Sequence, residues 1–418
     1  MNDHTNNTGS PQGAGKRKPR RNTKSNPSRR AVRKTGTKKK TRKNRRNKCV
    51  HEMDGDYKNI TAVINVKALK HNLEYLRKKS GTEVMPVLKA NAYGHGIIEV
   101  AKICRGFGVR YIGVATLGEA MQIRDSGDKG RILGWLYDVH SDQVRQAVSK
   151  NIDVGIFDEN HIDIISESLP ANARANIHLF VDTGIDRNGV PYEDAIRAAV
   201  KIVANPKFHL VGVMSHLCCA STKNNVPTLK QLTIFRELRE NLFKRNIKPE
   251  LFHIAATNGI LNYDVSDFTM VRSGAGFYGL DKHQNKNLTQ ALTLSSTVAQ
   301  LKYVPKGVGI GYDRTYITHH KEYIAIILIG YADLLPLIPH EKLSVTINGT
   351  KRKVLGLESM DQIVVQARKG DKLGDIVHIF GDKKKGFTSA IDFAEPSKTT
   401  AFNIVTHMGN RVNRKYVF

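Results

Sequence analysis

A regular alternation of short β-rich runs with longer stretches of helical period constrains this chain more than any other feature of its sequence. Thr61–Val66 is predicted as a strand, and the helix predicted over Lys67–Lys79 carries Leu69, Leu73 and Leu76 on one stripe. Further strands are predicted at Glu83–Leu88, Tyr111–Ala115, Arg131–Leu136, Asp153–Phe157, Ile177–Val181, Leu210–Met214 and Leu251–Ile254. About eight such strand–helix units predict a parallel sheet, and a closed (β/α)8 barrel of the TIM type over residues 50–288 fits the count best.

The rhythm changes after residue 288. Strands are predicted at Ala291–Tyr303, Tyr323–Ile329, Leu343–Ile347, Ile363–Ala367 and Ile376–Phe380, with no long helices between them. Turn-forming pairs such as Asn348-Gly349 and Gly381-Asp382 separate these runs. Residues 289–418 are therefore expected to form a C-terminal antiparallel β domain.

The first 49 residues differ from both predicted domains. They contain 18 Lys and Arg against one acidic residue, so this segment alone carries +17 of the net charge of +28. It has almost nothing to bury and is expected to be a disordered basic tail. Such a tail binds phosphate backbones or anionic membrane surfaces without sequence preference. A solvated extension without a function of its own is the alternative.

Cysteine content and hydropathy indicate in which cellular compartment the protein is expected. The chain has four cysteines, Cys49, Cys104, Cys218 and Cys219, which are too few and too scattered for a disulfide framework. The sequence contains no Cys-x-x-Cys pair, so a structural zinc site is not expected. No apolar run is long enough to span a bilayer, and no apolar segment follows the basic N-terminus to form a secretory signal. A cytoplasmic protein without a transmembrane segment is expected.

The most informative stretch is the decapeptide Val87–Gly96, VLKANAYGHG. Lys89 ends a predicted buried strand, where a barrel places its chemistry, and the small residues after it let a ligand approach the backbone. Partial desolvation would lower the pKa of this lysine and make its amine a better nucleophile. A solvated lysine at a strand end is the alternative from position alone.

The decapeptide resembles the cofactor-lysine motif of the alanine racemases, which bind pyridoxal 5′-phosphate, and the resemblance continues over nearly all of the predicted ordered chain. The other matching motifs are Val181–Gly189, Met214–His216, His253–Thr257, Val271–Gly274, Gly311–Tyr316 and Ser359–Gln362. They occur in the family's order and on the predicted elements. Several separated motifs of this kind are a far more specific signal than one lysine motif.

The resemblance implies a two-base racemase with these site residues. Lys89 would act on the D-face of the substrate Cα and Tyr312 on the L-face, with His216 favouring the phenolate and Arg272 lying beyond it and facing the pyridine nitrogen. The remaining residues implied as cofactor contacts are Tyr93, Thr257, Gly274 and Ala275, and those implied as substrate contacts are Arg187, Met360 and Asp361. Because Tyr312 and Met360 reach into the partner subunit's site in this family, a homodimer with shared active sites is also implied.

Two departures from the family pattern bear on the substrate. Phe180 stands where many members have a carbamylated lysine that orients the substrate arginine, so something else must hold Arg187, and Asp186 or an anion is a candidate. Phe402 is taken as the counterpart of a C-terminal tyrosine that caps the phosphate.

Three functions therefore stay open. The first is racemisation of alanine, which would supply D-alanine for peptidoglycan. The second is racemisation of a broader range of amino acids on the same fold. The third, from another class, is nucleic-acid binding through the basic tail. A basic amino-acid decarboxylase of related fold is disfavoured, because such enzymes place a carboxylate where this chain has Arg272.

Overall fold

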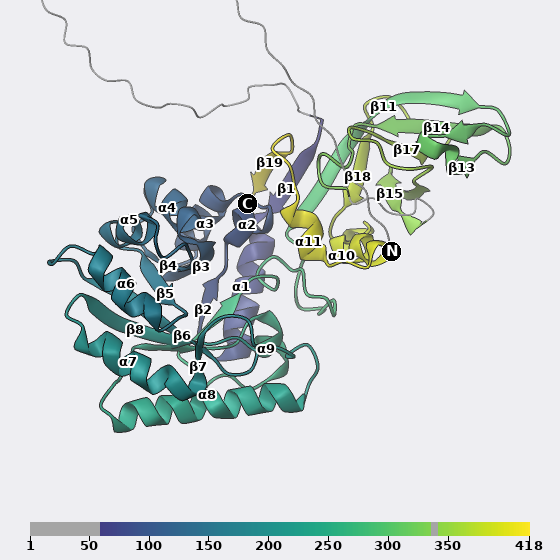
Figure 1. The fold of residues 1–418 in the computed structure, drawn as a ribbon. Helices are drawn as coiled ribbons and strands as arrows, with labels where there is room; N and C mark the ends of the chain where they lie inside the picture. The colour runs from purple at the N-terminus through teal and green to yellow at the C-terminus, as the bar shows by residue number, and fades with distance from the viewer. Residues whose placement is uncertain (1–58, 336–341) are drawn as a thin grey trace, which may run out of the picture. The chain divides into compact units, whose positions relative to one another are not determined.

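A computed structural model of the chain describes residues 59–335 and 342–418 (Figure 1). The expectation of a disordered tail over residues 1–49, and of its binding to nucleic acid or anionic surfaces, lies outside the described residues. Among the described helices, none combines the length and the apolar character needed to cross a membrane.

Eight parallel strands form the N-terminal barrel. They are β2 (Glu83–Pro86), β3 (Tyr111–Thr116), β4 (Arg131–Leu136), β5 (Asp153–Ile156), β6 (Ala175–Asp182), β8 (Phe208–Met214), β9 (Leu251–His253) and β10 (Met270–Ser273). Strands β3 to β9 pair in chain order, and β10 pairs with β2. The ring closes through Leu88 N–H to Gly113 O (2.8 Å) and Arg272 N–H to Ala255 O (2.9 Å). The predicted (β/α)8 class is confirmed.

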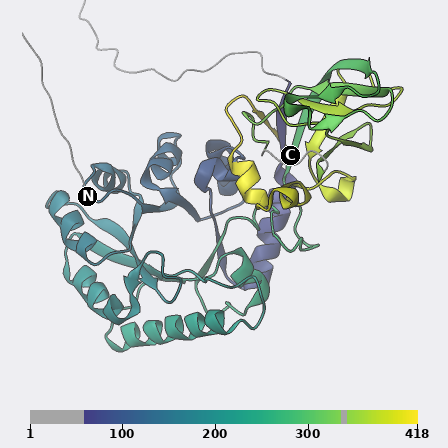
Figure 2. The same ribbon diagram turned by 45° about the vertical axis from the view of Figure 1, so that its right-hand side comes forward.

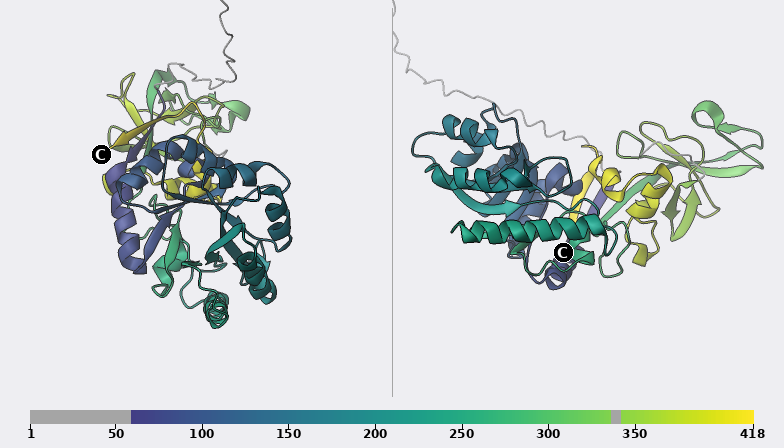
Figure 3. Two further views of the ribbon diagram at one scale, coloured as in Figure 1. Left: turned by 90° about the vertical axis from the view of Figure 1, so that its left-hand side faces the viewer. Right: turned by 60° about the horizontal axis from the view of Figure 1, so that its bottom comes forward.

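Helices connect these strands and lie on their outer side (Figure 2 and Figure 3). They are α1 (Val66–Ser80), α3 (Ile97–Gly106), α4 (Leu117–Asp125), α5 (Gln143–Ser149), α6 (Asn160–Ser168), α7 (Ala195–Ala204), α8 (Val226–Lys244) and α9 (Thr257–Asn262). The strand centres are continuously buried, as in β5 and β10, because helices cover one face and the barrel interior the other.

One strand was predicted in the wrong sheet. β1 (Thr61–Asn65), expected to open the barrel, instead pairs with β11 (Leu292–Val304) and β19 (Asn413–Val417) of the C-terminal sheet. The eighth barrel strand is β10, for which no strand was predicted, although it overlaps the Val271–Gly274 motif. β1 alternates buried and half-buried residues, a pattern typical of a sheet with one face toward solvent rather than of a barrel strand.

The C-terminal domain is built on an eight-stranded sheet with the path β16-β15-β18-β11-β1-β19, joined at β11 by β14 and then β17. The remaining bounds are β14 (Glu322–Ile327), β15 (Ser344–Ile347), β16 (Thr350–Lys353), β17 (Ile363–Gln366) and β18 (Ile376–Phe380). Its pairs are antiparallel except β1 with β19. The Asn348-Gly349 turn joins β15 to the unpredicted β16, and both residues have positive φ (48° and 72°), as a tight hairpin turn requires.

Candidate active site

Lys89 follows β2 directly and begins a left-handed turn. In α2 (Lys89–Tyr93), the four residues after Lys89 all have φ between 52° and 55°. This conformation is unfavourable by roughly 1–2 kcal/mol for each non-glycine residue, so the surroundings must hold it. The Glu119 carboxylate does so in part, because its Oε1 accepts the Ala90 N–H at 2.6 Å. Asn91 contributes from within the turn, where its Oδ1 accepts the Ile97 N–H at 2.8 Å.

The charges around Lys89 favour its neutral form. Burial, then Arg187, and more weakly Arg272 lower the pKa of the Lys89 ammonium, while Glu119 opposes them. A larger fraction of the amine is therefore unprotonated at neutral pH than in a solvated lysine. Arg187, Glu119 and Arg272, whose charges shift this pKa, are therefore neighbours of Lys89 in the site.

Arg272 is buried at the centre of this group. Its Nη1 donates to His253 Nδ1 (2.8 Å) and His253 O (2.7 Å), and its Nη2 donates to Ser215 O (2.5 Å) and His216 Nδ1 (3.2 Å). Burial and the charge of Arg187 lower the pKa of Arg272 to about 10, so it remains a cation at neutral pH. The guanidinium is thus fixed by neutral acceptors and lacks a carboxylate partner among the described residues.

His216 is held neutral by the same cation. Burial, followed by the charges of Arg272, Arg187 and Lys89, lowers the pKa of His216 to about 3. Because a guanidinium can only donate, His216 Nδ1 must be an acceptor, and the ring proton is on Nε2. His216 therefore offers an N–H on its free nitrogen.

A small-residue turn follows Arg272 and forms a cradle suited to a phosphate. The Gly276 N–H donates to Thr257 Oγ1 (3.0 Å), whereas the N–H groups of Gly274 and Ala275 have no acceptor among the described residues. A Cβ on Gly274 would collide with the Tyr93 phenol. Burial raises the pKa of Tyr93 to about 12, so it is a neutral donor. Free N–H groups and neutral hydroxyls fit a phosphate, and with Lys89 and Arg272 they fit the expected cofactor.

Arg187 lies in the loop after β6. Asp182 Oδ1 organises this loop by accepting the N–H groups of Gly184 (2.8 Å) and Ile185 (3.0 Å). The Arg187 Nε donates to Asn188 Oδ1 at 3.3 Å, so the described partner is Asn188 rather than the expected Asp186. Phe180 is buried in the barrel interior among apolar residues such as Met214.

Tyr312, Met360 and Asp361 belong to the C-terminal domain and are not brought to Lys89 within one chain. Tyr312 follows β12 (Gly309–Ile310) and precedes β13 (Tyr316–Ile317), which Figure 1 shows far from α2. Tyr312 and Met360 are 67% and 52% exposed, which is unusual for side chains of their apolar area. Asp361 accepts from Arg411 Nη1 at 2.6 Å.

Comparison with known proteins identifies the family. Residues 64–282 match the family model "Alanine racemase, N-terminal domain", and residues 291–416 match "Alanine racemase, C-terminal domain". The chain belongs to the alanine racemase family. Members of this family are isomerases, and the chain is an enzyme of that class.

Individual alanine racemases resemble the chain over most of their length. The alanine racemase of Thermobifida fusca is 33% identical over 366 residues, covering 85% of this chain and 97% of that protein. The crystal structure of the Streptomyces lavendulae alanine racemase has a TM-score of 0.82 at 32% identity, covering 86% and 97%. The Bacillus anthracis alanine racemase, solved with bound L-Ala-P, has a TM-score of 0.78 at 27% identity, covering 86% and 95%.

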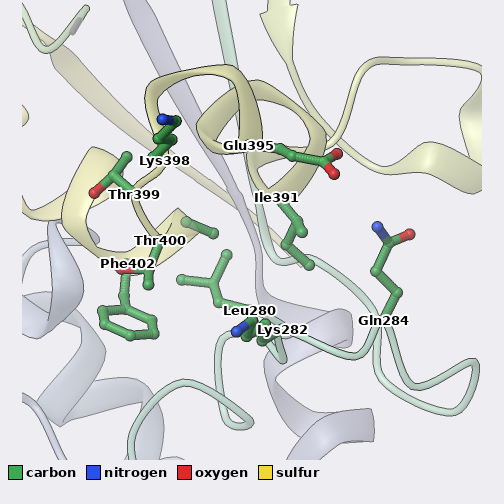
Figure 4. A pocket seen from close by; sticks show the side chains of 10 residues that line it. Leu280, Lys282, Gln284, Ile391, Glu395, Lys398, Thr399, Thr400 and Phe402 are labelled. Atoms are coloured by element: carbon green, nitrogen blue, oxygen red, sulfur yellow. The ribbon is translucent and has the colours of Figure 1, made fainter.

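The correspondence of Phe402 to the phosphate-capping tyrosine of alanine racemases stays a prediction. Phe402 is in α11 (Ala401–Thr406), and its side chain lines a separate pocket of about 430 Å³ with Leu280 and Ile391 (Figure 4). None of the predicted site residues lines that pocket. Phe402 is 39% exposed, because it lies on the outer side of a short helix whose buried residues are Ala401, Ile404 and Val405.

Glu119 is the main site residue that sequence reasoning missed. A signal was present, since Thr116 and Glu119 have the spacing of a capping box, which the structure contains at the start of α4. The same carboxylate also accepts the Ala115 N–H at 3.1 Å. Its reach to Ala90 depends on the neighbouring strand and could not be predicted from local spacing.

Proposed function

We propose that this enzyme interconverts L-alanine and D-alanine with pyridoxal 5′-phosphate held covalently by Lys89. The observation that carries the proposal is the convergence of Lys89, Arg187, His216 and Arg272 at one edge of an alanine racemase barrel. The lowered pKa of Lys89 supports this, because covalent attachment needs an unprotonated amine.

Different residues of this chain would hold different parts of the cofactor. The Gly274 and Ala275 N–H groups, with Thr257 and Tyr93, would hold the phosphate. Arg272 would face the pyridine nitrogen and, as a donor that keeps its proton, leave that nitrogen unprotonated. When bound, pyridoxal phosphate withdraws electrons from the substrate Cα and makes its proton removable.

Two residues would move protons at the substrate Cα, one from each face. Lys89 would take or return a proton on the D-face and Tyr312 on the L-face. A phenol is a weak base at neutral pH and needs a neighbour that stabilises its phenolate. His216 is suited to that role, because its Nε2–H is a donor and cannot compete for the phenol's proton.

Substrate binding would combine residues of two subunits. Arg187, Met360 and Asp361 would orient the amino-acid carboxylate. The exposure of Tyr312 and Met360 supports a homodimer in which each C-terminal domain completes the partner's site. We further propose that the enzyme acts in the cytoplasm and that its D-alanine enters peptidoglycan synthesis.

Exchange of the Cα proton in D2O tests the function directly. Purified protein supplied with pyridoxal phosphate should convert L-alanine to a racemic mixture and incorporate one deuterium at Cα, measured by chiral chromatography and mass spectrometry. Lys89→Ala should do neither, and borohydride reduction should label peptide Lys89 only in the wild type. Absence of racemisation by cofactor-loaded wild type would refute the proposal.

The substrate range separates alanine racemisation from the broader alternative. Alanine, serine, lysine and arginine should be compared by kcat/KM. A hydrophobic pocket discriminates by only about 1–3 kcal/mol per methylene, which corresponds to roughly 10- to 200-fold in kcat/KM. Alanine is expected to have the highest value, and a higher value for a larger amino acid would support the broad-specificity function.

A further inference from the structure

A continuous chain of polar side chains runs through the barrel interior below Arg272. Asp153 begins β5, His178 lies within β6, and His253 ends β9. Arg272 Nη1 lies 2.8 Å from His253 Nδ1, His253 Nε2 lies 3.0 Å from His178 Nδ1, and His178 Nε2 lies 3.3 Å from Asp153 Oδ2. Both histidines and Asp153 have no solvent exposure. We call these four side chains the barrel relay.

The donors in the barrel relay can be assigned from its ends. Arg272 can only donate, so His253 Nδ1 accepts and the His253 proton is on Nε2. That proton is donated to His178 Nδ1, which leaves the His178 proton on Nε2. The remaining acceptor is the Asp153 carboxylate. Both histidines are therefore neutral with the proton on Nε2, and every bond in the chain has one donor and one acceptor.

Asp153 is kept ionised so that it can end the chain. Burial raises its pKa, but hydrogen bonds from His178 and Arg131, together with the charge of Arg131, outweigh burial and hold the pKa below its usual value. Arg131 Nη2 donates to Asp153 Oδ2 at 2.6 Å. Tyr111 lies beside this pair, and burial with the Asp153 charge raises the pKa of its phenol, so it remains neutral.

Gly212 makes the contact between the two histidines possible. β8 lies between β6 and β9, and Gly212 pairs with His178 on one side and Leu251 on the other. A Cβ at this position would lie 2.7 Å from His178 Nδ1, the atom that accepts from His253. Any larger residue would therefore occupy the space of the hydrogen bond.

We infer that Asp153 and Gly212 are positioning residues that fix, through the rings of His178 and His253, the orientation of Arg272. The inference rests on the proposed function, in which Arg272 faces the cofactor's pyridine nitrogen. A neutral His253 with a lone pair on Nδ1 accepts from Arg272, whereas the other tautomer would point a proton at the guanidinium. Without its terminal acceptor, the buried Nε2–H of His178 has no partner, so the His178 ring is no longer held in place and its contact with His253 loosens.

Histidine ring NMR of the full-length, cofactor-loaded enzyme tests the inference. With 15N-labelled histidine, two-bond 1H–15N correlations report which nitrogen carries each proton, and a 15N–15N coupling across the His253–His178 hydrogen bond should be detectable. Wild type should show both protons on Nε2. Asp153→Asn retains an acceptor oxygen and should keep this pattern and the coupling, whereas Asp153→Ala should weaken the His253–His178 coupling and shift the His178 Nε2 resonance, because that N–H has lost its acceptor. Gly212→Ala should abolish the coupling.

Two matched variants control for general damage. Asp128→Ala removes another buried carboxylate paired with an arginine (Arg105, 2.7 Å) outside the relay. Gly113→Ala introduces an equally close contact, 2.7 Å to Met85 Sδ, in the same interior. Both should keep the wild-type histidine pattern. A wild-type His253 proton on Nδ1, or an Asp153→Ala spectrum identical to wild type, would overturn the inference.

Kinetics provide a second readout. Asp153→Ala should lower kcat for alanine by about tenfold while KM stays within about twofold, because the relay contacts Arg272 and not the substrate. Asp153→Asn should recover most of that loss. If wild type does not racemise alanine, the proposed function fails, but the ring spectra still decide whether the relay exists.

Discussion

Nη2 of Arg272 lies 3.2 Å from Nδ1 of His216, and this contact defines the electrostatics of the site. A permanent donor beside one ring nitrogen forces the other to carry the proton. Together with burial, the cation also lowers the pKa of His216 to about 3. The histidine is therefore a fixed neutral donor and not a base in the working pH range.

Replacing Arg272 by lysine should show that the site needs the several donors of a planar guanidinium and not only its positive charge. An ammonium cannot reach the acceptors on Ser215, His253 and His216 together. Each buried acceptor left without a donor is unfavourable by about 1–3 kcal/mol. Arg272→Lys should therefore lower both kcat and the urea midpoint of unfolding. A wild-type midpoint with normal kcat would contradict this account.

Acid should destabilise the fold through its buried histidines. The pKa is lowered to about 4 in His95 and about 3 in His216, and well below 6.5 in His253, in each case mainly by burial. The unfolded chain binds protons near pH 6.5 and the folded chain does not. Stability from these groups is thus complete above pH 6.5 and falls toward pH 4, by about 1.4 kcal/mol per pH unit for each histidine.

His95→Gln isolates one of these contributions. The free energy of unfolding, measured by urea titration between pH 6 and pH 4.5, should fall less steeply in the variant than in wild type by about 1.4 kcal/mol per pH unit. Parallel slopes for the two proteins would mean that His95 is not held neutral by the fold.

Glu119 should be needed for a competent Lys89. Glu119→Ala removes the acceptor of the Ala90 N–H and the charge that opposes Arg187 at Lys89. The left-handed turn should loosen, and the dissociation constant for pyridoxal phosphate should rise at least tenfold. Thr116→Ala breaks only the helix cap, at about 1 kcal/mol of stability, and should leave cofactor affinity unchanged. If both substitutions changed the affinity for pyridoxal phosphate equally, Glu119 would act only as part of the helix cap.

Mixing two inactive variants should restore activity if sites are shared between subunits. In a heterodimer of Lys89→Ala and Tyr312→Phe, one site loses both residues and the other keeps both. Random reassociation gives about half heterodimers, so roughly a quarter of wild-type activity should return. No recovery after confirmed subunit exchange would show that Tyr312 serves its own chain.

A bulkier residue at Gly274 should disturb the phosphate cradle. A Cβ there collides with the Tyr93 phenol, so Gly274→Ala should weaken pyridoxal phosphate binding in equilibrium dialysis. Gly381→Ala also introduces a close side-chain contact, 2.8 Å to Phe387 compared with 2.2 Å to the Tyr93 hydroxyl at Gly274, but in the C-terminal domain, and is the control. Affinity that is equal in the two variants would argue against the cradle.

The local sequence pattern was sufficient to predict several features of the fold and of the site. Lys89 at a strand end and the Asn348-Gly349 hairpin follow from short-range sequence, because strand ends and turns are set by neighbouring residues. The assignment of β1 failed for the same reason, since five residues that form a strand do not say which sheet they join. Glu119 and Ala90 are 29 residues apart, and their contact depends on adjacent strands.

The sequence by itself determined the sheet classes, the lysine at the end of β2 and the family motifs, since each depends on residue type and spacing along the chain. Only the tertiary structure decided which residues surround that lysine and which way their protons point. His178 and His253 meet across β8 because Gly212 leaves room between them. Hydrogen-bond direction depends on what lies at both ends of a chain of contacts, and that information exists only once the barrel closes.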